Sequence, residues 1–151
     1  MAGLYFEEFH VGQTFEHDLK RTVTETDNVL ISTLTHNPAA IHLDAESSRD
    51  TIFKRRIVNS IYTLGLTIGV SVADTTLGTT IGNLGFDEVR FPRPVFVGDT
   101  LRFRTIVHEV RESKSRPDSG IVTFVHQAFN QHDQEVMSCQ RVALMLKKPA
   151  P

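Results

Sequence analysis

The sequence contains a single cysteine, Cys139, among its 151 residues. One cysteine excludes an internal disulfide and a structural zinc site built on thiolates. Cys139 falls within an apolar run, where a free cysteine usually behaves as a small hydrophobic residue. We therefore expect a core position for Cys139 and no reactive thiol.

An excess of charge of either sign is also missing. The chain has 16 Lys and Arg against 18 Asp and Glu, a formal net charge of -2. This balance provides no general attraction to nucleic acid or to an anionic membrane, so neither is expected as a partner. Any phosphate group must be bound by a local basic cluster.

Long apolar runs are absent as well. The longest apolar stretch, residues 61–73, is interrupted by Tyr, Thr, Gly and Ser, and no charged-then-apolar leader opens the chain. Neither a membrane span nor a signal peptide is predicted, and we expect a cytoplasmic protein. There is no internal repeat, and the fractions of hydrophobic (40%) and charged (23%) residues are typical of globular proteins. A single domain over residues 1–151 is predicted, with its core at about residues 5–146.

The first half of the chain predicts helices. Thr24 and the acidic residues after it indicate a helix start, and Asn37-Pro38 ends that run. Asp44 is expected to cap a second, short helix over residues 45–53. Residues 57–73 are apolar on nearly all sides, which predicts a helix that is buried all round.

The second half predicts strands. Turn residues separate runs rich in Val, Ile, Phe and Thr, and Val122, Phe124, His126 and Ala128 would share one face of a strand. The order predicts an α+β fold, with an antiparallel sheet around a long buried central helix and a short helical overhang before it. Strands are expected over residues 83–91, 100–110, 121–130 and 136–147. Residues 6–15 are expected to form an entry strand and a turn.

His42 is the leading candidate for chemistry. Histidine is the side chain whose ordinary pKa lies closest to physiological pH, and a short irregular segment after the first helix presents it. Asn37 lies upstream on the same segment, where a carboxylate would complete an acid/base pair that an amide cannot form. No group of histidines and carboxylates has the spacing of a metal site, so no metal is expected.

Two stretches resemble the MaoC-like, (R)-specific enoyl-CoA hydratase family, which has the hot-dog fold. Residues 37–42, followed by Asp44, resemble the hydratase motif Asp-x-Asn-Pro-x-His. Residues 89–101 are similar to the signature Arg-Phe-x-x-Pro-Val-x-x-Gly-Asp-Thr-Leu. Mesaconyl-CoA hydratases of this group look most similar. The resemblance implies a hot-dog fold and an acyl-CoA hydratase/dehydratase that uses a CoA thioester as substrate and needs no separate cofactor.

The first motif departs from the family at three positions. Asn37 stands where the family has its catalytic Asp, while Ala39 and Ala40 replace Asn and Pro. The resemblance implies that His42 adds water to the C2–C3 double bond of a 2-enoyl-CoA as acid and base, with Asn37 orienting the water. The alternative is a non-catalytic acyl-CoA-binding module, for which Asn37 in place of Asp is the motivating observation. A hot-dog thioesterase would need an acid or nucleophile on the central helix, and residues 59–62 supply neither.

Two further groups of residues are candidates for holding the substrate. Backbone N–H groups at a helix start can hold the charge that develops on a thioester oxygen, so Asn59 and Ser60 are oxyanion candidates, although both fit simple helix caps equally well. For the phosphates of CoA, the candidates are Arg56, with its neighbour Arg55, and Lys114, Ser115 and Arg116 in a charged turn, unless those side chains are merely solvated.

The resemblance also predicts self-association. A lone hot-dog sheet exposes one edge, so a homodimer or higher homo-oligomer is expected, with acyl-CoA as the small-molecule partner. In the family the acyl-CoA site lies at that subunit interface, which the resemblance implies for this chain.

Overall fold

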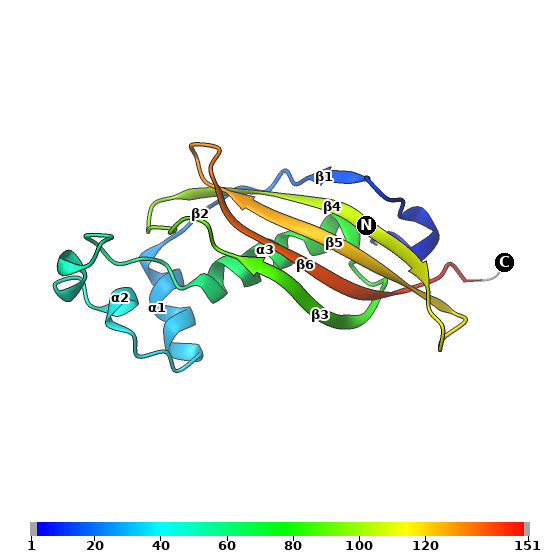
Figure 1. Ribbon diagram of the computed structural model, residues 1–151, viewed down its shortest axis with the longest axis horizontal. Coiled ribbons are helices and arrows are strands. Elements are labelled where there is room, and N and C mark those ends of the chain that lie inside the picture. Colours follow the sequence, from blue (N-terminus) through cyan, green and yellow to red (C-terminus); the bar gives the residue numbers. More distant parts are fainter. Residues whose placement is uncertain (1–2, 150–151) are drawn as a thin grey trace.

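A computed structural model of the protein describes residues 3–149 (Figure 1). The four long strands predicted in the second half are confirmed, each to within a few residues. In chain order the elements are a 3-10 helix η1 (Phe6–Glu8), β1 (Thr14–Glu16), β2 (Arg21–Thr22), α1 (Glu25–Leu34), α2 (Ala40–Leu43), η2 (Ser47–Asp50), α3 (Ser60–Thr75), β3 (Thr80–Arg90), β4 (Thr100–Glu112), β5 (Ser119–Phe129) and β6 (Glu135–Leu146).

The strands form one antiparallel sheet in the order β1-β4-β5-β6-β3, and β2 also pairs with β4. The long helix α3 lies along this sheet, with α1 and α2 beyond one end of it (Figure 1). On β5, the predicted inward face is confirmed, because Val122, Phe124, His126 and Ala128 are all fully buried. The expected α+β fold, a sheet around a central helix with a helical overhang before it, is confirmed.

The prediction that α3 is buried all round was wrong. Its buried side consists of Thr and Ser, whereas Ile61 is 51% exposed and Gly65 and Gly69 face outward. Small side chains at a spacing of four residues let the helix approach the sheet closely. Three of the hydroxyls, those of Thr67, Ser71 and Thr75, bond back to carbonyls along the helix, as Thr67 does to Thr63 at 2.7 Å. The residues of this buried side are Thr63, Thr67, Ser71 and Thr75.

The overhang differs from its prediction in its second helix. Thr24 caps α1 as predicted, and it exchanges hydrogen bonds with Asp27. Asp44, however, ends a helical turn instead of starting a helix over residues 45–53, and His42 therefore lies on α2. The Asp44 carboxylate still accepts backbone N–H bonds from Glu46 and Ser47, which explains why it looked like a cap. Residues 6–8 form η1 instead of part of a first strand.

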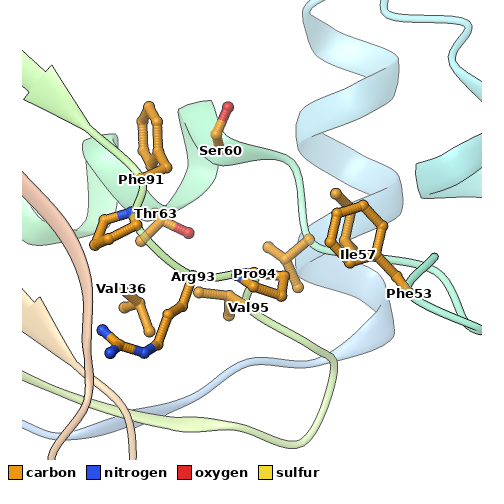
Figure 2. Close-up of a pocket in the computed structure, with 11 residues that line it drawn as sticks. Phe53, Ile57, Ser60, Thr63, Phe91, Arg93, Pro94, Val95 and Val136 are labelled. Carbon is orange, nitrogen blue, oxygen red and sulfur yellow. The ribbon is translucent and has the colours of Figure 1, made fainter.

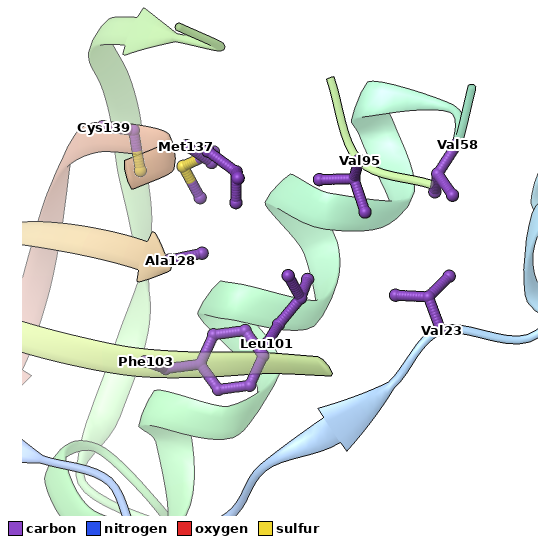
Figure 3. Close-up of a cluster of buried hydrophobic side chains, with 9 residues drawn as sticks. Val23, Val58, Val95, Leu101, Phe103, Ala128, Met137 and Cys139 are labelled. Atoms are coloured by element: carbon purple, nitrogen blue, oxygen red, sulfur yellow. The ribbon is translucent and has the colours of Figure 1, made fainter. Parts of the chain in front are cut away.

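One hydrophobic cluster joins the overhang to the sheet. Val58 lies just before α3, and its N–H donates to the carbonyl of Val95 at 2.8 Å. Val23, Val58, Val95, Leu101 and Phe103 are almost fully buried together near α3 (Figure 3). Burial of such a side chain stabilises the fold by roughly 1.5–3 kcal/mol. The cluster thus fixes the segments on both sides of the start of α3.

Cys139 belongs to the same cluster and is 1% exposed, which confirms its predicted core position. Burial raises the pKa of its thiol to about 11. Within residues 3–149, no helix is both long enough and apolar enough to cross a membrane.

Candidate functional site

His42 is held in place through one ring nitrogen. It lies on α2 with 9% of its surface exposed, and its Nδ1 is 2.9 Å from the carbonyl oxygen of Ile57. A carbonyl only accepts hydrogen bonds, so Nδ1 carries the proton and donates it. The other nitrogen, Nε2, is therefore left with a free electron pair. A neutral imidazole in this tautomer is arranged to accept a proton at Nε2.

Asn28 on α1 ties together the segments that carry this histidine. It is 2% exposed, and its Nδ2 donates to the carbonyls of His42 and Ile57 at 3.2 and 3.1 Å. Its Oδ1 accepts the N–H of Asn59 at 2.8 Å. One buried amide therefore fixes α2, the segment before α3 and the start of α3. Sequence reasoning missed Asn28, because nothing local distinguishes it from other polar residues on α1.

Asn37 shapes the loop that leads to α2. Its Oδ1 accepts the N–H of Ala39 at 3.0 Å, and its own N–H donates to the carbonyl of Ser32 at 2.9 Å. The side chain is half-buried and forms no hydrogen bond with His42 in the described structure. Asn37 and His42 are thus parts of one short segment whose side chains are held by different partners, Ala39 and Ile57.

A pocket of about 270 Å³ opens at the start of α3 (Figure 2). Phe53 and Ile57 line it from one side, and Ser60 and Thr63 come from α3. Ile57 belongs both to this pocket and to the hydrogen bond that holds His42. The remaining lining residues are mostly apolar and come from the segment after β3 and from β6: Phe91, Pro92, Arg93, Pro94, Val95 and Val136, with Val58 beside Ile57.

The oxyanion prediction needs a correction at Asn59. Its N–H is already bound to Asn28, and its side chain caps α3 by accepting the N–H of Ile61 at 3.0 Å. Asn59 is therefore a helix cap and cannot hold an oxyanion at the same time. Ser60, which lines the pocket, has a backbone N–H without a protein partner in the described structure.

The residues predicted to bind CoA do not lie together. Arg56 pairs with Glu25 at 2.7 Å near the start of α3. Lys114, Ser115 and Arg116 lie in the turn between β4 and β5, at the other end of the sheet from the overhang (Figure 1). The length of β4 separates the two places by roughly 40 Å, at about 3.3 Å per residue. Within one chain, these four residues cannot form a single phosphate site.

Arg55 and Arg56, both candidates from the sequence, line a basic pocket whose other cations, Arg49 and Lys54, sequence reasoning did not include. It has a volume of about 290 Å³, and its lining includes Arg49, Lys54, Arg55 and Arg56. Arg49 pairs with Glu46, and Arg56 with Glu25, which leaves Lys54 and Arg55 without an ion-pair partner among residues 3–149. The Arg55 guanidinium stacks on the ring of Phe96, 3.7 Å from its centroid. The sequence feature that indicates this pocket is the run of three consecutive cationic residues at positions 54–56.

The antiparallel sheet around α3, with a helical overhang before it, defines the class of hot-dog proteins. A family profile described as "MaoC like domain" matches residues 7–128, and the chain belongs to this family. It is 32% identical to a mesaconyl-CoA hydratase of Cereibacter sphaeroides, a match over 99% of this chain and 44% of that protein.

Solved structures agree on the fold. A structure described as the monoamine oxidase regulatory protein of Archaeoglobus fulgius superposes with a TM-score of 0.88 at 33% identity and covers 99% of this chain and 98% of its own. A Mycobacterium tuberculosis protein described as having a double hotdog fold shares the fold, with a TM-score of 0.88 at 23% identity over 99% of this chain and 46% of that chain. The hot-dog prediction is thereby confirmed.

The chain spans between 41% and 44% of the length of four curated relatives that it matches over 99% of its own length. The activities in the names of those relatives belong to proteins about twice as long as this chain.

Proposed function

We propose that the protein is an acyl-CoA hydratase/dehydratase, which adds water reversibly to the C2–C3 double bond of a 2-enoyl-CoA. The relative named mesaconyl-CoA hydratase supports branched acyl groups of the mesaconyl type as substrates. One observation carries the proposal: His42 Nδ1 lies 2.9 Å from the carbonyl oxygen of Ile57, and Ile57 also lines the apolar pocket.

In the proposed reaction, His42 Nε2 takes a proton from water while the water oxygen bonds to C3. The imidazolium then returns the proton to C2, so one water is added in total. The Ser60 N–H at the start of α3 stabilises the charge that forms on the thioester oxygen. Asn37 orients the water. No metal or separate cofactor takes part in this scheme.

The positions of the two pockets support a CoA thioester as the substrate. Phe53 and Ile57 line the apolar pocket, whereas Lys54 and Arg55, between them in sequence, line the basic one. Two other neighbouring residues are divided in the same way, because Val95 lines the apolar pocket and Phe96 lines the basic one. The acyl group would occupy the apolar pocket, and the CoA phosphates would meet Lys54 and Arg55.

We also propose a homodimer. The outer edge of β3 has no strand partner among residues 3–149, and Leu84 and Phe86 are 55% and 41% exposed on this strand. On α3, Ile61, Gly65 and Gly69 form an exposed apolar stripe. Pairing two copies along these surfaces would bury the edge of β3 and the stripe on α3. The two copies together would contain about as many residues as one of the longer relatives. A single domain over residues 1–151 and a cytoplasmic location remain predictions.

The function is tested by incubating the purified protein with crotonyl-CoA and with mesaconyl-CoA. Loss of enoyl absorbance without release of free thiol is the expected result. Thiol release would identify a thioesterase instead. Saturable acyl-CoA binding with neither reaction would identify a non-catalytic binding module, for which Asn37 in place of the family's Asp is the motivating observation.

A further inference from the structure

Arg141 is buried on the side of the sheet that faces α3, with its guanidinium 5.1 Å from the centroid of the Phe124 ring and no carboxylate paired with it among residues 3–149. It lies on β6 opposite Phe124, is 2% exposed, and its Nε and Nη2 have no hydrogen-bond partner in the described structure. A buried, unpaired guanidinium is costly, and such groups normally pair with an anion. Burial lowers the pKa of Arg141 to about 10, so it remains charged at neutral pH.

A pocket beside this arginine is large enough for a small organic molecule. It has a volume of about 310 Å³ and lies between α3 and β3. Ile68 and Val72 line it from α3, Ile81 and Gly82 line it from β3, and Arg141 lies at its base. The pocket therefore combines apolar walls with one buried positive charge.

A chain of hydrogen bonds leads to the same region. His17 is 6% exposed, and its Nδ1 is 2.6 Å from the Asp74 carboxylate. Its Nε2 is 2.8 Å from the Thr105 hydroxyl, which is 2.9 Å from Nδ1 of His126. The Nε2 of His126 is buried and has no partner in the described structure. Arg141 is close enough for its charge to act on His126.

His126 does not line the pocket. The hydrogen bonds through Thr105 hold its ring within reach of the charge on Arg141, so they concern the surroundings of the guanidinium and not the ligand.

We propose that this pocket is a second binding site, which takes a small carboxylate with an apolar body. The carboxylate accepts hydrogen bonds from Arg141, and the apolar body lies between Ile68, Val72 and Ile81. This pocket shares no lining residue with the one beside Ile57. From Ser60 to Val72, α3 rises by roughly 18 Å, at about 1.5 Å per residue. The site is thus separate from His42 in the same chain and independent of the hydratase proposal.

Isothermal titration with isovalerate tests the site, and isovaleramide is the uncharged probe of the same shape. Wild-type protein should bind isovalerate about tenfold more tightly than isovaleramide or better, because a hydrogen bond to a charged group is stronger than a neutral one. Arg141→Met should abolish that preference. Arg111→Met, which removes an exposed arginine from β4, should leave it unchanged.

A second variant keeps Arg141 and fills the pocket. A Cβ placed on Gly82 meets nothing within 4 Å, so Gly82→Ile can be accommodated, and it should abolish isovalerate binding. Equal affinity for the two probes, or no saturable binding of isovalerate to the wild type, would overturn the proposal. So would weaker self-association of Arg141→Met in sedimentation together with no isovalerate binding, because the guanidinium would then serve the subunit interface next to β3.

Discussion

His42 donates its Nδ1–H to the carbonyl oxygen of Ile57 across 2.9 Å. This bond sets the tautomer of the imidazole and leaves Nε2 as the proton acceptor. The same Ile57 lines the apolar pocket at the start of α3. A single residue therefore connects the orientation of the proposed base with the place proposed for the acyl group.

Asn28 should be essential for the stability of this arrangement. Asn28→Ala removes the three hydrogen bonds to His42, Ile57 and Asn59. We expect the free energy of unfolding to fall by roughly 2–4 kcal/mol, because buried backbone groups lose their partners. Urea denaturation followed by circular dichroism measures the change. Thr26→Ala, on the exposed side of α1, is the control and should change it by less than about 0.5 kcal/mol. Equal effects of the two substitutions would contradict the role assigned to Asn28.

Replacing Asn37 by aspartate should increase hydration. The carboxylate keeps the acceptor for the Ala39 N–H, so the loop should fold as before. Its second oxygen supplies the base that the amide cannot provide, and we expect kcat to rise by about tenfold or more. Steady-state kinetics with mesaconyl-CoA checks this. A fall in kcat in a folded variant would show that the amide itself is required.

The basic pocket should control the affinity for CoA. The double substitution Lys54→Gln with Arg55→Gln should raise KM for enoyl-CoA substrates about tenfold or more, because charge-assisted contacts with phosphates are lost. The kcat should change little, since neither side chain is close to the reacting carbons in the proposed complex. Substrates shortened to an acyl-pantetheine, which lack all the phosphate groups of CoA, should lose this difference.

The control for that experiment is a double substitution that also removes one Lys and one Arg, but at another place on the protein. Lys114→Gln with Arg116→Gln alters the turn between β4 and β5 and should leave KM unchanged. A KM that rises for this pair and stays constant for Lys54 and Arg55 would place the CoA phosphates at the turn, reached across a subunit interface.

Cys139 should resist alkylation in the folded protein. Only the thiolate reacts, and with a pKa of about 11 the thiol stays protonated at pH 8. Its 1% exposure also blocks access of the reagent. Iodoacetamide followed by mass spectrometry should find the native protein unmodified and the urea-unfolded protein fully modified. Rapid labelling of the native protein would refute the buried position.

Features set by neighbouring residues were predictable from the sequence. The cap of α1 depends on Thr24 and Asp27, which are three residues apart, and strand alternation on β5 depends on side-chain type alone. Which side of α3 meets the sheet was not predictable, because a helix that is apolar on most sides carries no local signal for its orientation. The sheet instead selects the Thr and Ser side, where Thr63 and Thr67 permit close packing.

The candidate site was predictable in part for a related reason. His42 was identified from its motif. Its hydrogen-bond partner Ile57 and the buried Asn28 are distant from it in sequence and are brought together only by folding. Likewise, β4 runs from the end of the sheet near Arg56 to the turn that carries Arg116 at the other end. The composition of the sequence gives no information about this separation.

The measurement that bears most directly on the proposed function is the hydration rate of His42→Ala with crotonyl-CoA and mesaconyl-CoA. If His42 Nε2 is the acid and base, kcat should fall by about a hundredfold or more, while acyl-CoA binding is retained. His36→Ala, which changes an exposed histidine near the same loop, serves as the control and should keep the wild-type rate. A folded His42→Ala variant that hydrates at the wild-type rate would contradict the account.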